Sequence, residues 1–267
     1  LHIYQEYTEK LLKDEKAYCC YCTREELANS REKQVRENKS LKYDKHCSNL
    51  SEEEKKRYET EGRKPVIRLK IPVKKIVFND LLRGEVTFDG ELLSDFVIMK
   101  SGGIPTYNYA VVIDDALMKI TDVMRGDDHI SNTPKQIVIY EALGLDVPKF
   151  AHIPMIMGQD HSRLSKRHGA TSVMEYKKVG YMPEAVVNYI AHLGWSPGDE
   201  REIFTKEELI KEFSLDKISK HAAVFSMEKL NWFNSEYLKN MSIDSLTKTL
   251  LPFLKEANYI ENEESLL

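Results

Sequence analysis

The sequence has few cysteines, and all of them lie near its beginning. They are Cys19, Cys20, Cys22 and Cys47, so disulfide bonds cannot hold the rest of the chain together. The first residues do not have the pattern of a signal peptide. These features argue against a disulfide-stabilised secreted protein, and a reducing cytoplasm is the expected compartment.

Long apolar runs and an excess of positive charge are also missing. No stretch approaches the roughly 18 apolar residues of a membrane span, so no membrane association is expected. The 39 basic and 43 acidic residues give a net charge of −4, which provides no overall attraction to nucleic acid. Any RNA partner must therefore bind through local basic patches.

The length of 267 residues allows two domains and part of a third. Residues 1–18 carry apolar side chains at helical spacing, which predicts a helix that packs against another part of the molecule. Because the sequence starts inside this pattern and without methionine, we expect it to be an internal piece of a longer protein.

Four segments begin with a capping box, in which Ser or Thr is followed three residues later by Glu. These segments start at Thr23, Ser51, Ser172 and Thr205. Gly62 is expected to end the helix that Ser51 begins. The charged composition from Thr23 to Gly62 predicts a solvated helical hairpin.

Strand and helix patterns alternate in the centre of the chain. Residues 66–71 and 120–124 predict strands, 133–144 a helix, and the apolar run 153–157 the end of a buried strand. This order predicts half of a doubly wound α/β sheet, in which ligands bind beyond the carboxyl ends of the strands. From Ser172 onward the pattern predicts helices only.

A basic loop follows the last of these strands. It contains Arg163, Ser165, Lys166 and Arg167, with glycine on both sides. Such cations can bind a polyphosphate and stabilise the charge that builds up during phosphate transfer. The alternative is a solvated surface turn, because basic loops are common.

A second candidate site combines Arg125, at the end of strand 120–124, with Tyr107 on the preceding helix. A guanidinium fork and a phenol donor together suit the carboxylate of an acidic amino acid. The alternative is internal, with Arg125 bridged to Asp127 or Asp128 for structural reasons.

Three segments carry a resemblance to a known family. The sequence from Arg163 to Arg167 resembles the KMSKS signature of class I aminoacyl-tRNA synthetases, in the form found in glutamyl-tRNA synthetases. Arg163 departs from that form, in which lysine is usual. Residues 105–115 and 125–133 resemble two further segments of the same family, in the same order and spacing. The resemblance covers nearly the whole chain.

The resemblance implies an α/β fold with several domains. Residues 1–20 and 101–170 would form the second half of a Rossmann-like nucleotide-binding domain. Residues 21–100 would form an α+β insert that binds the acceptor end of tRNA. Residues 171–240 would form an all-helical domain that contacts the tRNA stem, and 241–267 the start of a helical anticodon-binding domain.

The resemblance also implies an activity. A glutamate–tRNA ligase activates glutamate with ATP and Mg²⁺ and transfers it to the 3′ end of tRNA(Glu) in cytoplasmic translation; we expect a monomer. The first half of the nucleotide-binding fold, with its HIGH-type signature, has no counterpart in these residues, so this chain alone is expected to be inactive.

Site residues follow from the matched positions. Tyr107, Val111 and Arg125 would line the glutamate pocket; some family members carry Asn at the Val111 position. Asp128 would lie near the ATP ribose and the backbone of Ile156 against the adenine. The phosphates would meet Lys166, with the rest of the signature, Arg163, Ser165 and Arg167, beside it.

Two other functions stay open. A paralogue that transfers glutamate to a modified tRNA base would keep the pocket, but such proteins normally lack a long helical region after Gly169, which is present here. A non-catalytic tRNA-binding module is the other alternative. The sequence does not distinguish an enzyme specific for tRNA(Glu) from one that also accepts tRNA(Gln).

The cysteines resemble the zinc-binding segment of some glutamyl-tRNA synthetases. Cys20, Cys22 and Cys47 match three ligand positions, but Asn49 occupies the fourth and is a poor ligand for zinc. A structural zinc site requires four protein ligands. We therefore favour metal-free, partly buried thiols over a zinc site.

Overall fold

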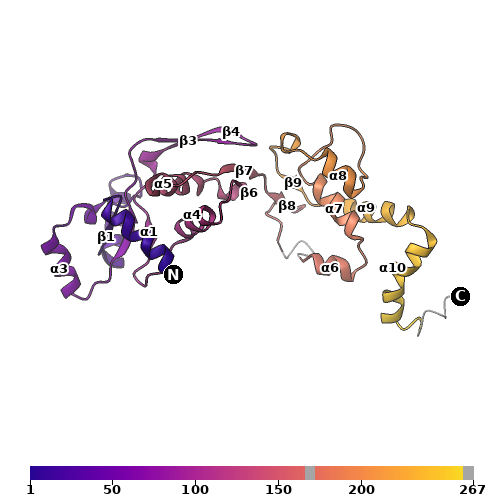
Figure 1. Cartoon of the computed structure of the whole chain (residues 1–267), viewed down its shortest axis with the longest axis horizontal. Coiled ribbons are helices and arrows are strands. Elements are labelled where there is room, and N and C mark those ends of the chain that lie inside the picture. Colours follow the sequence, from indigo (N-terminus) through magenta and orange to yellow (C-terminus); the bar gives the residue numbers. More distant parts are fainter. Residues whose placement is uncertain (166–171, 261–267) are drawn as a thin grey trace. The chain divides into compact units, whose positions relative to one another are not determined.

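The computed structural model describes residues 1–165 and 172–260, and the chain divides after Ile153 into two compact units (Figure 1). Each unit has its own apolar core. Among the helices in the described part of the chain, none is long and apolar enough to cross a membrane.

The first unit contains two sheets. The three-stranded sheet is antiparallel, in the order β1 (Ala17–Cys20), β2 (Val66–Leu69) and β5 (Val97–Met99). The four-stranded sheet has the order β4 (Gly84–Asp89), β3 (Lys75–Asp80), β7 (Lys149–Ile153) and β6 (Asp122–Gly126). Strands β3 and β4 form an antiparallel hairpin, whereas β7 runs parallel to both β3 and β6.

The first unit also contains helices (Figure 1). They are α1 (His2–Lys13), α2 (Arg24–Arg36), α3 (Glu52–Thr60), α4 (Tyr107–Leu117) and α5 (Thr133–Leu143), with 3₁₀ turns at His46–Asn49, Gly90–Leu92 and Asp127–His129. One apolar core joins α1, α4 and α5 to strands of both sheets. Helix α5 is buried on most of its surface, which explains why its apolar residues follow no single stripe.

The second unit is mainly helical. Its helices are α6 (Val173–Lys178), α7 (Pro183–His192), α8 (Lys206–Glu212), α9 (Met227–Lys239) and α10 (Ile243–Glu256), and a 3₁₀ turn spans Leu215–Lys217. Aromatic side chains of α7 and α9, among them Tyr189 and Phe233, form its core with Phe225. Short parallel strands β8 (Ile156–Met157) and β9 (Ala223–Val224) complete the unit.

Local sequence signals predicted the helix starts well. All four capping boxes are present, each with both of its reciprocal hydrogen bonds. Helix α5 begins with Pro134 in its first turn and ends at Gly144, as predicted. Because such signals depend only on neighbouring residues, they do not require knowledge of the tertiary fold.

Three predictions from the sequence were wrong. The first helix ends at Lys13, not at residue 18, because the chain turns at Glu15 with a positive φ of 55° and then enters β1. The apolar run 153–157 is half-buried and is divided between β7 and β8. The region after Ser172 also contains β9, whose two residues are too short to give a pattern.

The proposed boundary at residue 100 separates segments that share a sheet in the structure. Strand β3, from the predicted insert, pairs with β7. Leu69 and Ile98 lie in the same core as residues of α4 and α5. The division into an insert and a nucleotide-binding domain stays a prediction about function.

Candidate functional site

Arg125 lies near the carboxyl end of β6, where parallel strands commonly present ligand-binding side chains. Its Nε–H donates to His152 Nε2 at 3.2 Å, and Nη2 donates to Thr133 Oγ1 at 2.7 Å. The guanidinium also lies 5.4 Å from the centre of the Phe150 ring. Burial lowers the pKa of Arg125, while Tyr107 acts in the opposite direction and favours its charged form. These contacts fix the orientation of the Arg125 guanidinium and leave its other N–H groups to donate to a carboxylate.

Helix α4 brings Tyr107 and Val111 to one face, since they are four residues apart. Tyr107 interacts with Arg125, and its ring centre lies 5.9 Å from that of His129. Tyr107 is 54% exposed, so its phenol is accessible to a ligand. Val111 packs against the apolar core, so it offers apolar contact only. The structure therefore brings together Tyr107 and Arg125, as predicted.

The alternative role for Arg125 involved the aspartates that follow it. In the structure, Asp127 pairs with Arg83 of the β3–β4 turn at 2.6 Å. Asp127, Asp128 and His129 form a 3₁₀ turn directly after β6. This turn places Asp128 three residues beyond Arg125, at the same end of the sheet.

Sequence reasoning missed the residues that hold Arg125. His152 and Thr133 are fully buried, and the carboxylate of Asp80 lies 2.6 Å from His152 Nδ1. The sequence pattern indicated Thr133 only as the start of a helix and gave no indication of His152. The signal available in the sequence was the presence of polar side chains within otherwise apolar strands.

The basic loop lies in the second unit. Arg163 forms an antiparallel bridge with Met157, and Leu164 N donates to Ile156 O at 3.0 Å. Ile156 is therefore held on one side by this returning chain and on the other by β9. Ser165 is exposed. Lys166 and Arg167, the other two predicted phosphate ligands, lie outside the described residues.

Cys20, Cys22 and Cys47 come together, with ligand atoms within 4.8 Å of one another. The structure adds Tyr43, whose Oη lies 3.3 Å from Cys20 Sγ and 3.5 Å from Cys22 Sγ. Hydrogen bonds from Cys22 and Cys47 lower the pKa of the Cys20 thiol and so favour its thiolate. Tyr43 was missed because its spacing matches no cysteine or histidine pattern.

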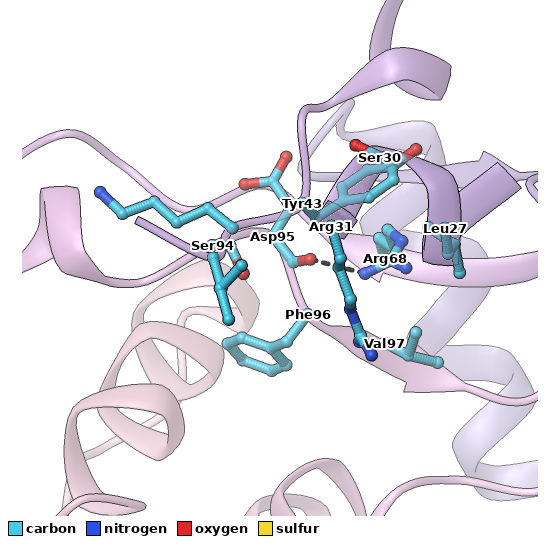
Figure 2. A pocket seen from close by; sticks show the side chains of 11 residues that line it. Leu27, Ser30, Arg31, Tyr43, Arg68, Ser94, Asp95, Phe96 and Val97 are labelled. Carbon is cyan, nitrogen blue, oxygen red and sulfur yellow. Dashed lines mark hydrogen bonds between the residues drawn. The ribbon is translucent and has the colours of Figure 1, made fainter. Parts of the chain in front are cut away.

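A cavity of about 410 Å³ lies beside this cluster, between α2 and the segment 94–97. Figure 2 shows Arg68 directed toward Asp95, and its Nη1 donates to the Asp95 carbonyl at 2.8 Å. The guanidinium of Arg68 also lies 3.8 Å from the centre of the Tyr43 ring. Arg31 and Phe96 are further lining residues. Cationic and aromatic side chains thus line this cavity, together with Asp95.

Comparison with known proteins places this geometry in a family. Residues 1–232 match the model for the catalytic domain of class I tRNA synthetases (E and Q). A glutamate–tRNA ligase of Carboxydothermus hydrogenoformans is 51% identical over 97% of this chain and 54% of its own length. One of Sulfurihydrogenibium sp. is also 51% identical, with the same two coverages.

Solved structures agree with the sequence matches. The crystal structure of a glutamate tRNA ligase from Elizabethkingia meningosepticum, in complex with its amino acid, superposes with a TM-score of 0.86 and 37% identity. It covers 98% of this chain and 58% of that protein. The present chain spans about half the length of the curated relatives that it matches. It has the mixed α/β fold of class I synthetases, and it belongs to their glutamate and glutamine family.

Proposed function

We propose that the complete protein is a glutamate–tRNA ligase. It would join glutamate to ATP as glutamyl-adenylate, release pyrophosphate, and transfer the glutamyl group to the terminal adenosine of tRNA(Glu). The observation that carries this proposal is Arg125, held at the end of β6 beside Tyr107. The family match supports the same activity. A cytoplasmic location and a monomeric state stay predictions.

Arg125 is suited to bind the side-chain carboxylate of glutamate. A guanidinium offers parallel N–H donors that match the two carboxylate oxygens. Tyr107 adds a phenol donor, and the apolar Val111 excludes water beside it. Because Arg125 is partly desolvated, its attraction to a carboxylate is stronger than it would be in water.

The remaining site residues would bind ATP. Asp128 would accept hydrogen bonds from the ribose, and the backbone of Ile156 would contact the adenine. Lys166 would meet the phosphates together with Arg163, Ser165 and Arg167. Magnesium would enter with ATP as part of the substrate. Adenylate formation requires charge stabilisation more than proton removal, which is why cations rather than a general base are proposed here.

The two proposed roles predict opposite kinetic effects in the complete protein. Lys166→Ala should lower kcat by on the order of 10²-fold, because its charge meets negative charge that grows in the transition state. Arg125→Ala should chiefly raise KM for glutamate. Aminoacylation kinetics measure both. An unchanged glutamate KM for Arg125→Ala would refute the pocket, and an unchanged kcat for Lys166→Ala would show that the loop only binds.

We also propose that Cys20, Cys22, Cys47 and Tyr43 hold a structural zinc ion. Tetrahedral ligands at the usual zinc distances lie about 3.5–3.8 Å apart. Cys22 Sγ and Cys47 Sγ are 3.5 Å apart, and Tyr43 Oη lies at 3.3 and 3.5 Å from two of the sulfurs. Tyr43 thus supplies the fourth ligand that Asn49 could not. Bound zinc would stabilise the fold of the insert.

Metal analysis of protein purified without chelator tests the zinc proposal. One zinc per chain is expected, with loss of most of it in Cys22→Ser and weaker retention in Tyr43→Phe. Cys19→Ser is the matched control, because this neighbouring thiol lies outside the cluster. Wild-type protein without bound zinc would contradict this proposal and support metal-free, hydrogen-bonded thiols.

A further inference from the structure

Asp80 is a buried carboxylate that organises the end of the four-stranded sheet. It is only 1% exposed. Its Oδ1 accepts from the backbone N–H of Leu82 and of Arg83, both at 3.0 Å. Its Oδ2 accepts from the backbone N–H of His152 at 3.1 Å and from Nδ1 at 2.6 Å. Burial raises the pKa of Asp80, but these hydrogen bonds outweigh it and lower the pKa overall.

The contacts of His152 determine its tautomer. Arg125 can only donate, so the Nε2 atom that faces its Nε–H at 3.2 Å must be an acceptor. The ring proton therefore lies on Nδ1 and is donated to Asp80. Burial lowers the pKa of His152, which agrees with a neutral ring. Both ring nitrogens thus have fixed roles: Nδ1 donates to Asp80, and Nε2 accepts from Arg125.

A neutral imidazole can orient an arginine without neutralising its charge. A carboxylate in its place would fix the guanidinium but would neutralise its charge and compete with an anionic substrate. The imidazole instead orients Arg125 through one lone pair. The negative charge of Asp80 stays on the far side of the ring, where it fixes the tautomer.

Thr133 completes the arrangement from helix α5. Its hydroxyl accepts from Arg125 Nη2 at 2.7 Å and lies 3.0 Å from His152 Nε2. The two contacts fix the Nε and Nη2 edge of Arg125. A planar group held along one edge has a defined orientation for its remaining donors.

We propose that Asp80 and His152 are positioning residues for glutamate: Asp80 fixes the tautomer of His152, and His152 in turn orients Arg125 toward the substrate carboxylate. This inference rests on the proposed function of Arg125 in glutamate binding. Neither residue touches the substrate, so their effect passes through Arg125.

The tautomer of His152 can be measured in the wild-type protein, and a variant is needed only to assign the signal. Nitrogen-15 NMR of the complete, histidine-labelled protein, assigned by the signal that disappears in His152→Gln, should show a protonated Nδ1 and an unprotonated Nε2 near pH 7. A proton on Nε2 would overturn the proposal. This result does not depend on glutamate, so it stands apart from the proposed enzyme activity.

Two conservative substitutions separate positioning from a purely structural role. His152→Asn keeps a polar group near the Nδ1 position for Asp80 but removes the acceptor for Arg125. His152→Gln does the reverse, because its amide reaches the Nε2 position. His152→Asn should raise KM for glutamate by about 10-fold or more, as expected when a hydrogen bond to a charged group is lost, with a much smaller change in kcat. His152→Gln should have a KM for glutamate closer to that of the wild type.

Controls make the result independent of folding. Thermal unfolding of each variant is measured, and Asp122→Asn serves as a matched carboxylate control on β6. Thr133→Val, which preserves shape, should also weaken glutamate binding.

If His152→Asn and His152→Gln weaken glutamate binding equally while Arg125→Ala also weakens it, only the positioning proposal is overturned. If Arg125→Ala has no effect, the glutamate pocket itself is wrong, and the inference falls with it.

Discussion

At the scale of single residues, the cationic side chains divide into buried and exposed groups with different roles. Arg68 is 8% exposed and lies against Tyr43, so its charge is committed to the structure. Arg31 is exposed at the rim of the same cavity. In the tRNA ligase that we propose, an exposed cation beside a cavity lined by aromatic side chains would be placed to contact the phosphates of the tRNA acceptor end.

Arg31→Ala should therefore weaken tRNA binding by the complete protein while leaving KM for glutamate unchanged. Loss of one phosphate contact should reduce the slope of log K against log salt by about 0.7–0.9. Filter binding at several salt concentrations measures this slope. Arg36→Ala is the matched control, because Arg36 lies on the same helix but does not line the cavity. Equal effects of the two substitutions would count against a specific contact.

At the scale of elements, the β3–β4 hairpin connects the site to the rest of the first unit. Asp80 is the last residue of β3, Arg83 lies in the turn that follows, and β4 ends directly before Gly90. There the Gly90 backbone N–H donates to Lys74 O at 3.1 Å. A side chain at Gly90 would find no room, since its Cβ would lie 2.1 Å from Lys74 O and 2.9 Å from Pro72 O.

Gly90→Ala should destabilise the protein by at least about 1–3 kcal/mol, because the contact is with backbone that cannot rotate away. Urea denaturation measures the change in the free energy of unfolding. Gly102→Ala is the control, since an added Cβ there meets nothing within 4 Å. Similar stability for both variants would show that the hairpin adjusts.

The parts of this arrangement that the sequence indicated are those that depend on local signals or on the spacing of residues within a motif. Arg125 and Tyr107 could be placed together because one ends a strand and the other begins a helix. His152 and Asp80 could not, because their pairing depends on which strands become neighbours, and Asp80 lies 72 residues before His152. Tyr43 was missed because its spacing matches no ligand pattern, and only the folded chain brings its phenol to the thiols.

At the scale of the whole molecule, the buried Asp80–His152 pair links stability to pH. The pKa of both groups is lowered by folding. The unfolded chain therefore binds more protons over the range between the folded and unfolded values. Stability from this pair is complete above the ordinary histidine pKa of about 6.5 and is lost as pH falls below it.

The free energy of unfolding should therefore decrease as the pH falls from 7.5 to 5.5. His152→Gln should reduce this decrease, because an amide does not titrate in that range. The groups facing His152 are Asp80 on β3, Arg125 on β6 and Arg83 on the hairpin turn. Urea denaturation at the two pH values measures the slope, with the exposed His221→Gln as control. The same slope in His152→Gln and wild type would assign the pH dependence to other groups.

The parallel pairing of β6 with β7 makes Arg125 and His152 register partners. Side chains alternate between the two faces of a strand, so inserting or deleting one residue within β6 would turn Arg125 to the opposite face. The loop between Gly144 and β7 does not have this constraint, because the hydrogen bonds between β6 and β7 align Arg125 with His152 whatever the length of the loop. Evolution can therefore change the length of that loop but not of the strand, and a family alignment with frequent gaps inside β6 would contradict this.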